Sequence, residues 1–179
     1  MDIDVNGKTM TARLMLSAEA IHTRVQQLAQ QINNDYPKDE PLVVLIVLHG
    51  AILFAADLVR GLSMPTVIET TRLKSYEGTQ SSGHIELVTA IPSGIHGKQV
   101  LIVEDIIDSG RSIAFLLPKV KEAGAKSIRI AALLDKPDAH ESSVKADYAG
   151  FEIGKHFVIG YGLDLDGRFR NLPYIAELV

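Results

Sequence analysis

The feature that most constrains the fold is the stretch Val100–Ser112. It opens with four consecutive apolar residues, 100–103, which predict a strand buried on both faces, because a half-exposed strand would alternate apolar and polar residues. Two adjacent acids follow, Glu104 and Asp105, and a third, Asp108, precedes a Ser-Gly-Arg-Ser turn and a mostly apolar helical pattern. The acids therefore fall where a strand gives way to a helix, at the carboxyl edge of a predicted parallel sheet. Open α/β sheets bind ligands at that edge.

The residue types in this turn favour a sugar phosphate as the ligand. Small residues at Ser109, Gly110 and Ser112 allow backbone N–H groups and hydroxyls to surround a phosphate, and the helix start adds the positive end of its dipole. The neighbouring carboxylates of Glu104 and Asp105 suit a vicinal diol, as ribose offers, or a hard cation such as magnesium. The alternative is a solvated acidic turn after a core strand.

The remaining hydrophobic pattern predicts strands that alternate with helices. We therefore expect one α/β domain, 1–179, with a mostly parallel central sheet flanked by helices. Ser17 is expected to cap a helix that ends within 33–37, with apolar positions at helical spacing at Ile21, Val25, Leu28, Ala29 and Ile32. The other expected elements are a central strand 42–48, a helix 51–60, strands 66–72, 86–91 and 127–134, and short strands near Asp147 and Phe157.

Two segments are predicted to be irregular. Residues 74–83 are polar and contain glycine, which predicts a mobile loop. Pro118 lies inside the helical pattern that follows Ser112, where its missing N–H and its ring oppose a regular helix. A kink or an early end is therefore expected at 114–118.

Composition narrows the class of protein. With 46% hydrophobic and 22% charged residues, the 179-residue chain is an ordinary globular sequence, and its net charge of −4 argues against a nucleic-acid partner. It has no run of 18 apolar residues and no signal-peptide pattern at its start, so we expect no membrane segment and a cytoplasmic location. The absence of cysteine excludes disulfides and thiolate sites, and the 6 histidines are scattered without the pairing of a zinc site.

The segment Glu104–Ser112 resembles the phosphoribosyl-diphosphate binding signature of type I phosphoribosyltransferases, in the form found in the hypoxanthine-guanine branch. Other segments agree with that family in order and approximate spacing, so the resemblance runs from about residue 10 to the C-terminus. These segments are Leu48-His-Gly-Ala51, Lys74-Ser-Tyr76, Leu134-Asp-Lys136, and Phe157-Val-Ile-Gly-Tyr-Gly-Leu-Asp164 with its continuation Phe169-Arg-Asn-Leu-Pro173.

The resemblance implies a type I phosphoribosyltransferase fold with a small base-binding hood at about 150–179. It implies an enzyme of purine salvage that joins hypoxanthine or guanine to 5-phosphoribosyl-1-diphosphate, with Mg²⁺ as cofactor. Glu104 and Asp105 would hold the ribose hydroxyls or the metal, and 108–112 would surround the 5′-phosphate. The family also implies a homodimer or homotetramer.

On the base side, the resemblance makes Asp108 the catalytic acid that faces N7 of the purine and exchanges a proton with it. Its position beside a phosphate-binding turn independently suits acid–base chemistry. Lys136 would donate to the 6-oxo group and so select oxopurines over adenine. Phe157 would stack on the purine, and the backbone of Val158 would read its Watson–Crick edge. The plainer interpretations are a helix cap at Asp108, a surface lysine and a core aromatic.

On the diphosphate side, the resemblance predicts a cis peptide bond between residues 48 and 49 that points backbone N–H groups, including that of Gly50, at the diphosphate. His49 stands where the family has Lys or Arg, so a titrating side chain replaces a permanent charge. Asp164 resembles the acid that holds a second magnesium through water. Arg170 resembles the arginine that grips diphosphate, with a surface arginine as the alternative.

Two further positions carry expectations from the family. Arg111 stands where the family often has Lys or Leu, and its side chain is expected to point outward from the phosphate turn. Ser75 and Tyr76 resemble part of a flexible lid, about 74–84, which would exclude water while diphosphate departs.

Two rival functions remain open. A xanthine-preferring or pyrimidine-directed enzyme of the same fold would share nearly all of these residues. A nucleotide-sensing RNA-binding regulator of the same fold would typically add a basic face, and this sequence carries no basic excess. The sequence does not rank hypoxanthine against guanine, because backbone carbonyls of any residue can read the purine 2-position.

Overall fold

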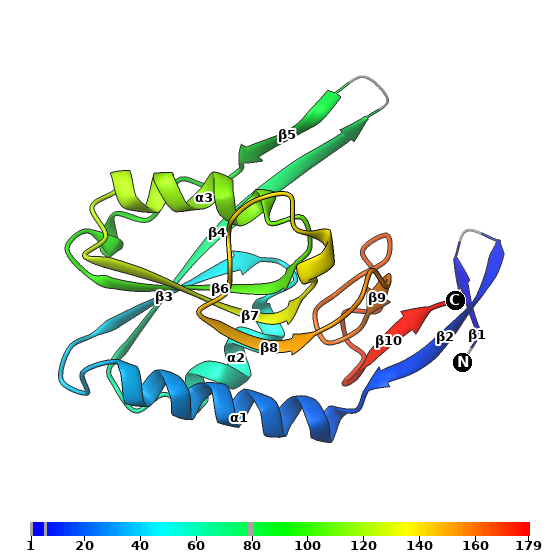
Figure 1. The fold of residues 1–179 in the computed structure, drawn as a ribbon, viewed down its shortest axis with the longest axis horizontal. Coiled ribbons are helices and arrows are strands. Elements are labelled where there is room, and N and C mark those ends of the chain that lie inside the picture. Colours follow the sequence, from blue (N-terminus) through cyan, green and yellow to red (C-terminus); the bar gives the residue numbers. More distant parts are fainter. Residues whose placement is uncertain (1, 6, 79–80) are drawn as a thin grey trace.

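The computed structural model of this protein describes residues 2–5, 7–78 and 81–179. Within these residues a six-stranded sheet has the order β5-β4-β3-β6-β7-β8 (Figure 1). β3, β4, β6, β7 and β8 are parallel, and β5 runs antiparallel to β4. This confirms the predicted α/β class with a mostly parallel sheet. The strands are β3 (Leu42–Leu48), β4 (Thr66–Gly78), β5 (Ser81–Leu87), β6 (Gln99–Ile107), β7 (Ser127–Asp135) and β8 (Tyr148–Glu152).

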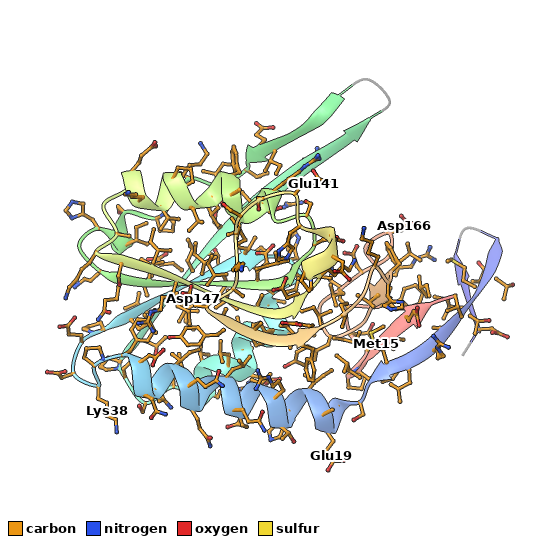
Figure 2. All side chains as sticks on the ribbon, viewed as in Figure 1. Met15, Glu19, Lys38, Glu141, Asp147 and Asp166 are labelled. Atoms are coloured by element: carbon orange, nitrogen blue, oxygen red, sulfur yellow. The ribbon has the colours of Figure 1, made fainter. Side chains whose placement is uncertain are left out.

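Helices cover both faces of this sheet. The helices α1 (Ala18–Asp35) and α2 (Ile52–Arg60) lie on one face and α3 (Arg111–Glu122) on the other (Figure 1). Alternate residues of the central strands supply the two cores. In β3, Val44 and Ile46 pack with α1 and α2, whereas Val43 and Leu45 pack with α3. The central strands are buried on both sides, as their unbroken apolar runs predicted. Side chains fill the space between α1 and the sheet (Figure 2).

The predicted first helix is confirmed in detail. The Ser17 hydroxyl accepts a hydrogen bond of 3.1 Å from the backbone N–H of Ala20 and so caps α1. The residues that α1 buries are Ile21, Val25, Leu28, Ala29 and Ile32, the same positions that the apolar spacing indicated.

A second sheet is built from the two ends of the chain. Its order is β1-β2-β10-β9, and its strands pair antiparallel (Figure 1). Ile3, Ala12, Ile159 and Ala176 form the buried centre of its core. A short strand near residue 157 was expected from the sequence, whereas β1, β2 and β10 were not. The strands are β1 (Asp2–Val5), β2 (Lys8–Leu16), β9 (Val158–Ile159) and β10 (Ile175–Leu178), and two 3-10 turns, Ser93–Ile95 and Pro137–Ala139, complete the elements.

Two expectations about irregular segments are overturned. An early end of the helix near Pro118, one of the two alternatives there, is wrong, because α3 continues through Pro118 to Glu122. The helix loses one hydrogen bond there, but Ile113, Leu116 and Val120 are fully buried against the sheet, and that packing outweighs the local penalty.

The second concerns the loop expected at 74–83, where the described residues on either side of 79–80 lie in strands. β4 continues through residue 78, and β5 begins at 81 and ends at Leu87, so the two strands form a hairpin. The strand predicted at 86–91 therefore lies earlier in the chain. Cross-strand pairing supplies the order that the polar composition did not indicate. Within the described part of the chain, no helix combines the length and the apolar character needed to cross a membrane.

Candidate active site

The stretch singled out in the sequence forms a loop at the carboxyl end of β6. β6 ends at Ile107, and α3 begins at Arg111, so only three residues join them. Gly110 occupies the N-cap position with φ of +76°, a conformation that favours glycine. A methyl group on Gly110 would lie 2.4 Å from the Ser142 hydroxyl, so the space is also closed to a side chain.

The N-cap geometry rules out one plain interpretation. The cap residue is Gly110, and no side chain caps the helix, so Asp108 is not the helix cap. The Asp108 carboxylate instead accepts a hydrogen bond of 2.7 Å from the Lys136 ammonium group. The Asp108 side chain is 56% exposed, which leaves it accessible to a ligand.

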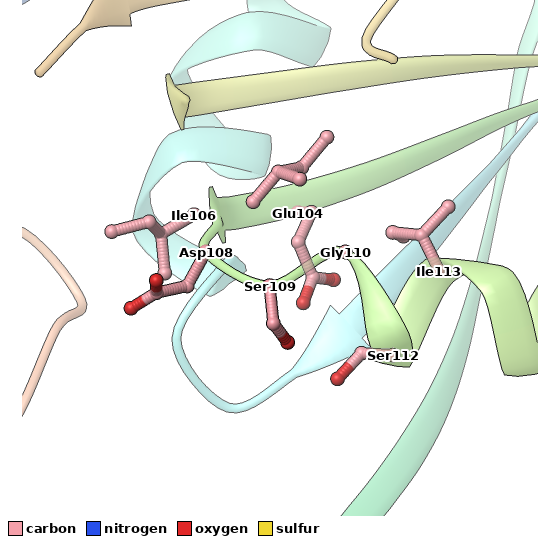
Figure 3. A pocket seen from close by; sticks show the side chains of 8 residues that line it. Glu104, Ile106, Asp108, Ser109, Gly110, Ser112 and Ile113 are labelled. Atoms are coloured by element: carbon pink, nitrogen blue, oxygen red, sulfur yellow. The ribbon is translucent and has the colours of Figure 1, made fainter. Parts of the chain in front are cut away.

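This loop encloses a cavity of about 190 Å³ (Figure 3). Figure 3 shows the Glu104 carboxyl directed toward the same space as the hydroxyls of Ser109 and Ser112. The helix N-terminus that borders this space brings backbone N–H groups and a positive dipole end to it, which suits a phosphate. The lining residues are Glu104, Ile106, Ile107, Asp108, Ser109, Gly110, Ser112 and Ile113.

Glu104 is a buried acid with one carboxyl oxygen unpaired among the described residues. Its Oε2 atom makes no hydrogen bond to any residue that the structure describes. Burial raises the pKa of the Glu104 carboxyl well above its usual range, and the neighbouring charge of Asp105 raises it further. A buried carboxylate without a counter-charge is costly, so this position favours a cationic or hydroxyl-bearing ligand.

Asp105, next to Glu104 near the end of β6, faces the loop that follows β3. Burial raises the pKa of its carboxyl to about 6, although two backbone N–H groups and Arg170 act in the opposite direction. The carboxyl lies against the loop after β3, because a methyl group on Gly50 would be only 1.6 Å from Asp105 Oδ2. The glycine at position 50 is therefore what leaves room for this acid.

A second cavity, of about 220 Å³, adjoins the first on the base side. Lys136 is only 7% exposed, so the surface-lysine interpretation is wrong. Phe157 is 53% exposed, so it is not a core aromatic either, and its ring is accessible for stacking. The cavity is lined by Asp105, Ile106, Asp108, Lys136, Phe157, Val158, Leu163 and Asp164.

The loop after β3 and the segment after β9 meet beside Asp105. The peptide bond between Leu48 and His49 is cis, as predicted. A methyl group on Gly162 would lie 2.0 Å from the Gly50 carbonyl oxygen, so the two backbones are in close contact. His49 itself has an exposed side chain.

Arg170 and Asp164 form an ion pair in the corner where the loop after β3 meets the segment after β9. The Arg170 guanidinium donates to the Gly162 carbonyl at 2.6 Å and pairs with the Asp164 carboxylate at 2.7 Å. Arg170 is therefore held toward the corner and is not a free surface arginine. It adds positive charge near Asp105 and the Gly50 backbone, where an anionic group of a substrate would bind.

The sequence-predicted residues are thus largely brought together. The two cavities and the adjoining corner unite Gly50, Glu104, Asp105, Asp108, Ser109, Gly110, Ser112, Lys136, Phe157, Val158, Asp164 and Arg170. Arg111 points away, because its side chain is more than half exposed and pairs with Glu141. The side chains of Ser75 and Tyr76 lie outside the described residues, so the lid stays a prediction.

The carboxylates in this site fit a magnesium ion that is coordinated partly by the protein and partly by a substrate. Among the described residues, no group of three or more His, Cys, Asp or Glu side chains could hold a metal alone. Magnesium, however, usually takes one or two carboxylates and completes its shell with water and substrate oxygens. Glu104 and Asp105 are desolvated carboxylates with raised pKa values, which is the environment that a bound cation would stabilise.

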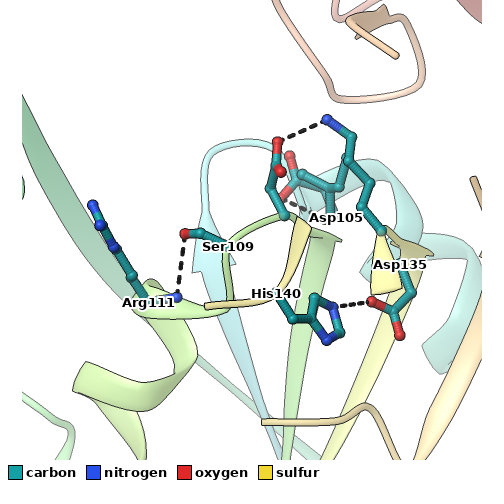
Figure 4. A network of polar contacts seen from close by, with 8 residues as sticks. Asp105, Ser109, Arg111, Asp135 and His140 are labelled. Carbon is teal, nitrogen blue, oxygen red and sulfur yellow. Dashed lines mark hydrogen bonds and ion pairs between the residues drawn. The ribbon is translucent and has the colours of Figure 1, made fainter. Parts of the chain in front are cut away.

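The turn that follows β7 was not among the features expected from the sequence. The Asp135 side chain at the end of β7 and the His140 side chain in the turn form a largely buried pair (Figure 4). Glu141 and Ser142 of the turn contact the loop at 109–111. The one available signal was a polar stretch directly after Lys136. That signal does not reveal which side chains turn inward.

Residues 15–166 match the phosphoribosyl transferase domain model, so the chain belongs to the phosphoribosyltransferase family. Within this family it is similar to enzymes named hypoxanthine-guanine phosphoribosyltransferase. The enzyme of Mycobacterium tuberculosis H37Rv is 41% identical over 92% of this chain and 85% of its own length, and that of Bacillus subtilis 168 is 38% identical over 93% and 92%. A crystal structure of such an enzyme from Bacillus anthracis, with HEPES in its active site, superposes with a TM-score of 0.87 at 38% identity and covers 93% of this chain and 98% of its own.

Proposed function

We propose that this protein transfers the 5-phosphoribosyl group of 5-phosphoribosyl-1-diphosphate to hypoxanthine or guanine, giving IMP or GMP and diphosphate in purine salvage. The observation that carries the proposal is the Lys136–Asp108 pair. It stands at the boundary between a cavity suited to phosphate and a cavity suited to a flat base. Cytoplasmic location and assembly as a homodimer or homotetramer belong to the same proposal.

The phosphate cavity would take the sugar. The backbone of 109–112 and the hydroxyls of Ser109 and Ser112 would bind the 5′-phosphate at the start of α3. Glu104 and Asp105 would hold the ribose 2′- and 3′-hydroxyls or magnesium, a role that suits the buried Glu104 and the half-buried Asp105 beside it. When bound, magnesium would offset charge on the diphosphate leaving group.

The corner near Gly50 would take the diphosphate. The backbone N–H groups after the cis peptide and the Arg170 guanidinium would bind its oxygens, and Asp164 would hold a second magnesium through water. His49 would lie beside the diphosphate, at the position where the family has Lys or Arg. Ser75 and Tyr76 would close over the site to exclude water.

The base cavity would orient the purine. Phe157 would stack on the ring, the Val158 backbone would meet the Watson–Crick edge, and the Lys136 ammonium group would donate to the 6-oxo oxygen. Nitrogen N9 then attacks C1 of the ribose as the bond from C1 to the diphosphate oxygen breaks. Asp108 exchanges a proton with N7, and the rest of the acceleration comes from positioning.

The decisive experiment measures nucleotide formation from hypoxanthine, guanine, xanthine and adenine with 5-phosphoribosyl-1-diphosphate and Mg²⁺. We expect turnover with hypoxanthine or guanine and none with adenine. Lys136→Ala should lower kcat/KM for hypoxanthine and guanine by about ten-fold or more, because the donor to the 6-oxo group is lost. Lys145→Ala, which removes an exposed lysine from the same segment, is the matched control.

Two outcomes would redirect the proposal. Turnover with xanthine well above the other bases would make the protein a xanthine-directed member of the family. A lack of turnover with every oxopurine, together with RNA binding that weakens steeply with salt, would favour the regulator.

A further inference from the structure

The segment that follows β7 contacts both halves of the site. We call residues 136–142 the bridging turn. At its start, the Lys136 N–H donates to the carbonyl of Ile107 at 2.9 Å, and the Lys136 ammonium group reaches Asp108. At its end, the Glu141 N–H donates to the Ser109 carbonyl at 3.0 Å. One short segment therefore touches the residue that would select the base and the loop that would bind the phosphate.

Side chains reinforce the contact with the phosphate loop. The Glu141 carboxylate pairs with the Arg111 guanidinium at the first turn of α3. The Ser142 hydroxyl occupies the space beside Gly110 that a side chain would otherwise take. The shape of the loop at 109–111 thus depends on where the far end of the bridging turn lies.

A largely buried pair of side chains, His140 and Asp135, links the bridging turn to the end of β7. The distance from His140 Nε2 to Asp135 Oδ1 is 2.6 Å, and these side chains are 13% and 12% exposed (Figure 4). Asp135 is the last residue of β7, and its carbonyl accepts a hydrogen bond of 2.8 Å from the Ile153 N–H. Asp135 is therefore fixed to the large sheet, and His140 fastens the distal part of the turn to it.

We infer that Asp135 and His140 are positioning residues that set the base-selecting lysine and the phosphate loop relative to each other. This inference rests on the proposed function. If the pair is broken, the Asp135 carboxylate loses its donor, and the bridging turn is held to the site by its backbone bonds to Ile107 and Ser109 without a side-chain link to β7. The spacing between Lys136 and the phosphate loop is then less well fixed, so the binding of purine and of phosphoribosyl diphosphate weakens together. The chemistry at Asp108 is left in place.

The test compares three single variants by steady-state kinetics with both substrates varied. His140→Leu removes the donor and keeps the bulk, whereas His140→Gln keeps an N–H at a similar reach. We expect His140→Leu to raise KM for hypoxanthine and KM for 5-phosphoribosyl-1-diphosphate by about five- to ten-fold each, with a smaller change in kcat. His140→Gln should restore most of both KM values. His22→Leu, at an exposed histidine on α1, is the matched control.

A purely structural role gives a different pattern. It would lower the melting temperature and the active fraction, and hence kcat, without raising both KM values. Unchanged KM for either substrate, or a glutamine variant as defective as leucine, overturns the inference. If His140→Leu does not fold, Asp135→Asn, which keeps the shape and weakens the acceptor, decides by the same criterion. An inactive wild type would instead contradict the proposed function, so the two failures are distinguishable.

Discussion

The two cavities of the site are assembled in different ways. The phosphate cavity is lined by residues of one continuous stretch, 104–113, at the end of β6. The base cavity draws on four separate parts of the chain, 105–108, Lys136, 157–158 and 163–164. A local loop can be recognised from its residue types, because each residue is constrained by its neighbours. A cavity gathered from distant segments depends on how those segments are held.

The supports of the two cavities differ accordingly. The phosphate loop rests on the large sheet and on the bridging turn. Beside the base cavity, β9 is paired with β10, which in turn pairs with β2 near the N-terminus. The side that would read the base is thus held by both ends of the chain, and remote substitutions should affect it more than the phosphate side.

The largest expected effect lies where the two cavities meet. Asp108→Asn should lower kcat by about 10²- to 10⁴-fold, the usual contribution of a general acid or base, while the KM for phosphoribosyl diphosphate changes little. Asp39→Asn, at an exposed position in the loop before β3, is the control. Full activity in the Asp108 variant would remove the basis for treating this acid as catalytic.

The second prediction concerns the close contact between the backbones of Gly162 and Gly50, beside Asp105. Gly162→Ala places a methyl group 2.0 Å from the Gly50 carbonyl oxygen and also strains a residue with φ of +103°. We expect a loss of about 2 kcal/mol or more in unfolding free energy, and weaker binding of phosphoribosyl diphosphate. Gly167→Ala shares the positive φ but has open space around it, so the difference in melting temperature isolates the clash. Equal effects at the two glycines would contradict this close contact.

The third prediction concerns Asp105 without metal. Because burial raises the pKa of its carboxyl from 3.8 to about 6, the folded protein keeps a proton that the unfolded chain has already lost between these pH values. Stability therefore falls as pH rises through this window, and the cost persists above pH 6. The carboxyl is partly accessible to solvent, so we expect Asp105→Asn to stabilise the magnesium-free protein by about 2 kcal/mol at pH 7.5.

Denaturation in chelator across pH 4 to 8 checks this prediction. The gain from Asp105→Asn should be near zero at the acid end and level off above pH 6. Substrate binding with Mg²⁺ should be weaker in the same variant. A gain that does not vary with pH would show that the charge of this acid is not the cause.

The smallest effect is expected for the contacts between β10, β2 and His156 that hold the strand beside the base cavity. Glu177 on β10 contacts both Arg13 of β2, at 2.6 Å, and His156, which precedes Phe157. The hydrogen bond from Arg13 is the main cause that lowers the pKa of the Glu177 carboxyl, and the contact with His156 lowers it further. His156→Ala should raise the purine KM by about two- to five-fold and leave the KM for phosphoribosyl diphosphate unchanged, since partly exposed pairs contribute little. An equal rise in the purine KM and in the KM for phosphoribosyl diphosphate would contradict the proposed difference between the base cavity and the phosphate cavity.

Much of the large sheet could be predicted from local patterns. The strand at 42–48, the helix capped by Ser17 and the strand–turn–helix around Asp108 are all present. Where local patterns failed, tertiary contacts prevailed. Burial of α3 against the sheet outweighed Pro118, and pairing of β4 with β5 ordered a polar segment that has the composition of a loop.

The amino-acid order was enough to indicate the α/β class and the strand–turn–helix around Asp108, because these depend on runs of neighbouring residues. The residues expected to meet the base, Lys136, Phe157 and Val158, were indicated only by the resemblance to a family. Contacts between remote segments depend on how the whole chain packs. The Arg13–Glu177 pair spans 164 positions, and the Lys136–Asp108 pair spans 28. Even over the five positions from Asp135 to His140, the turn between them must fold before the pair can form. Such contacts emerge only when the sheet has brought the strand ends together and excluded water from them.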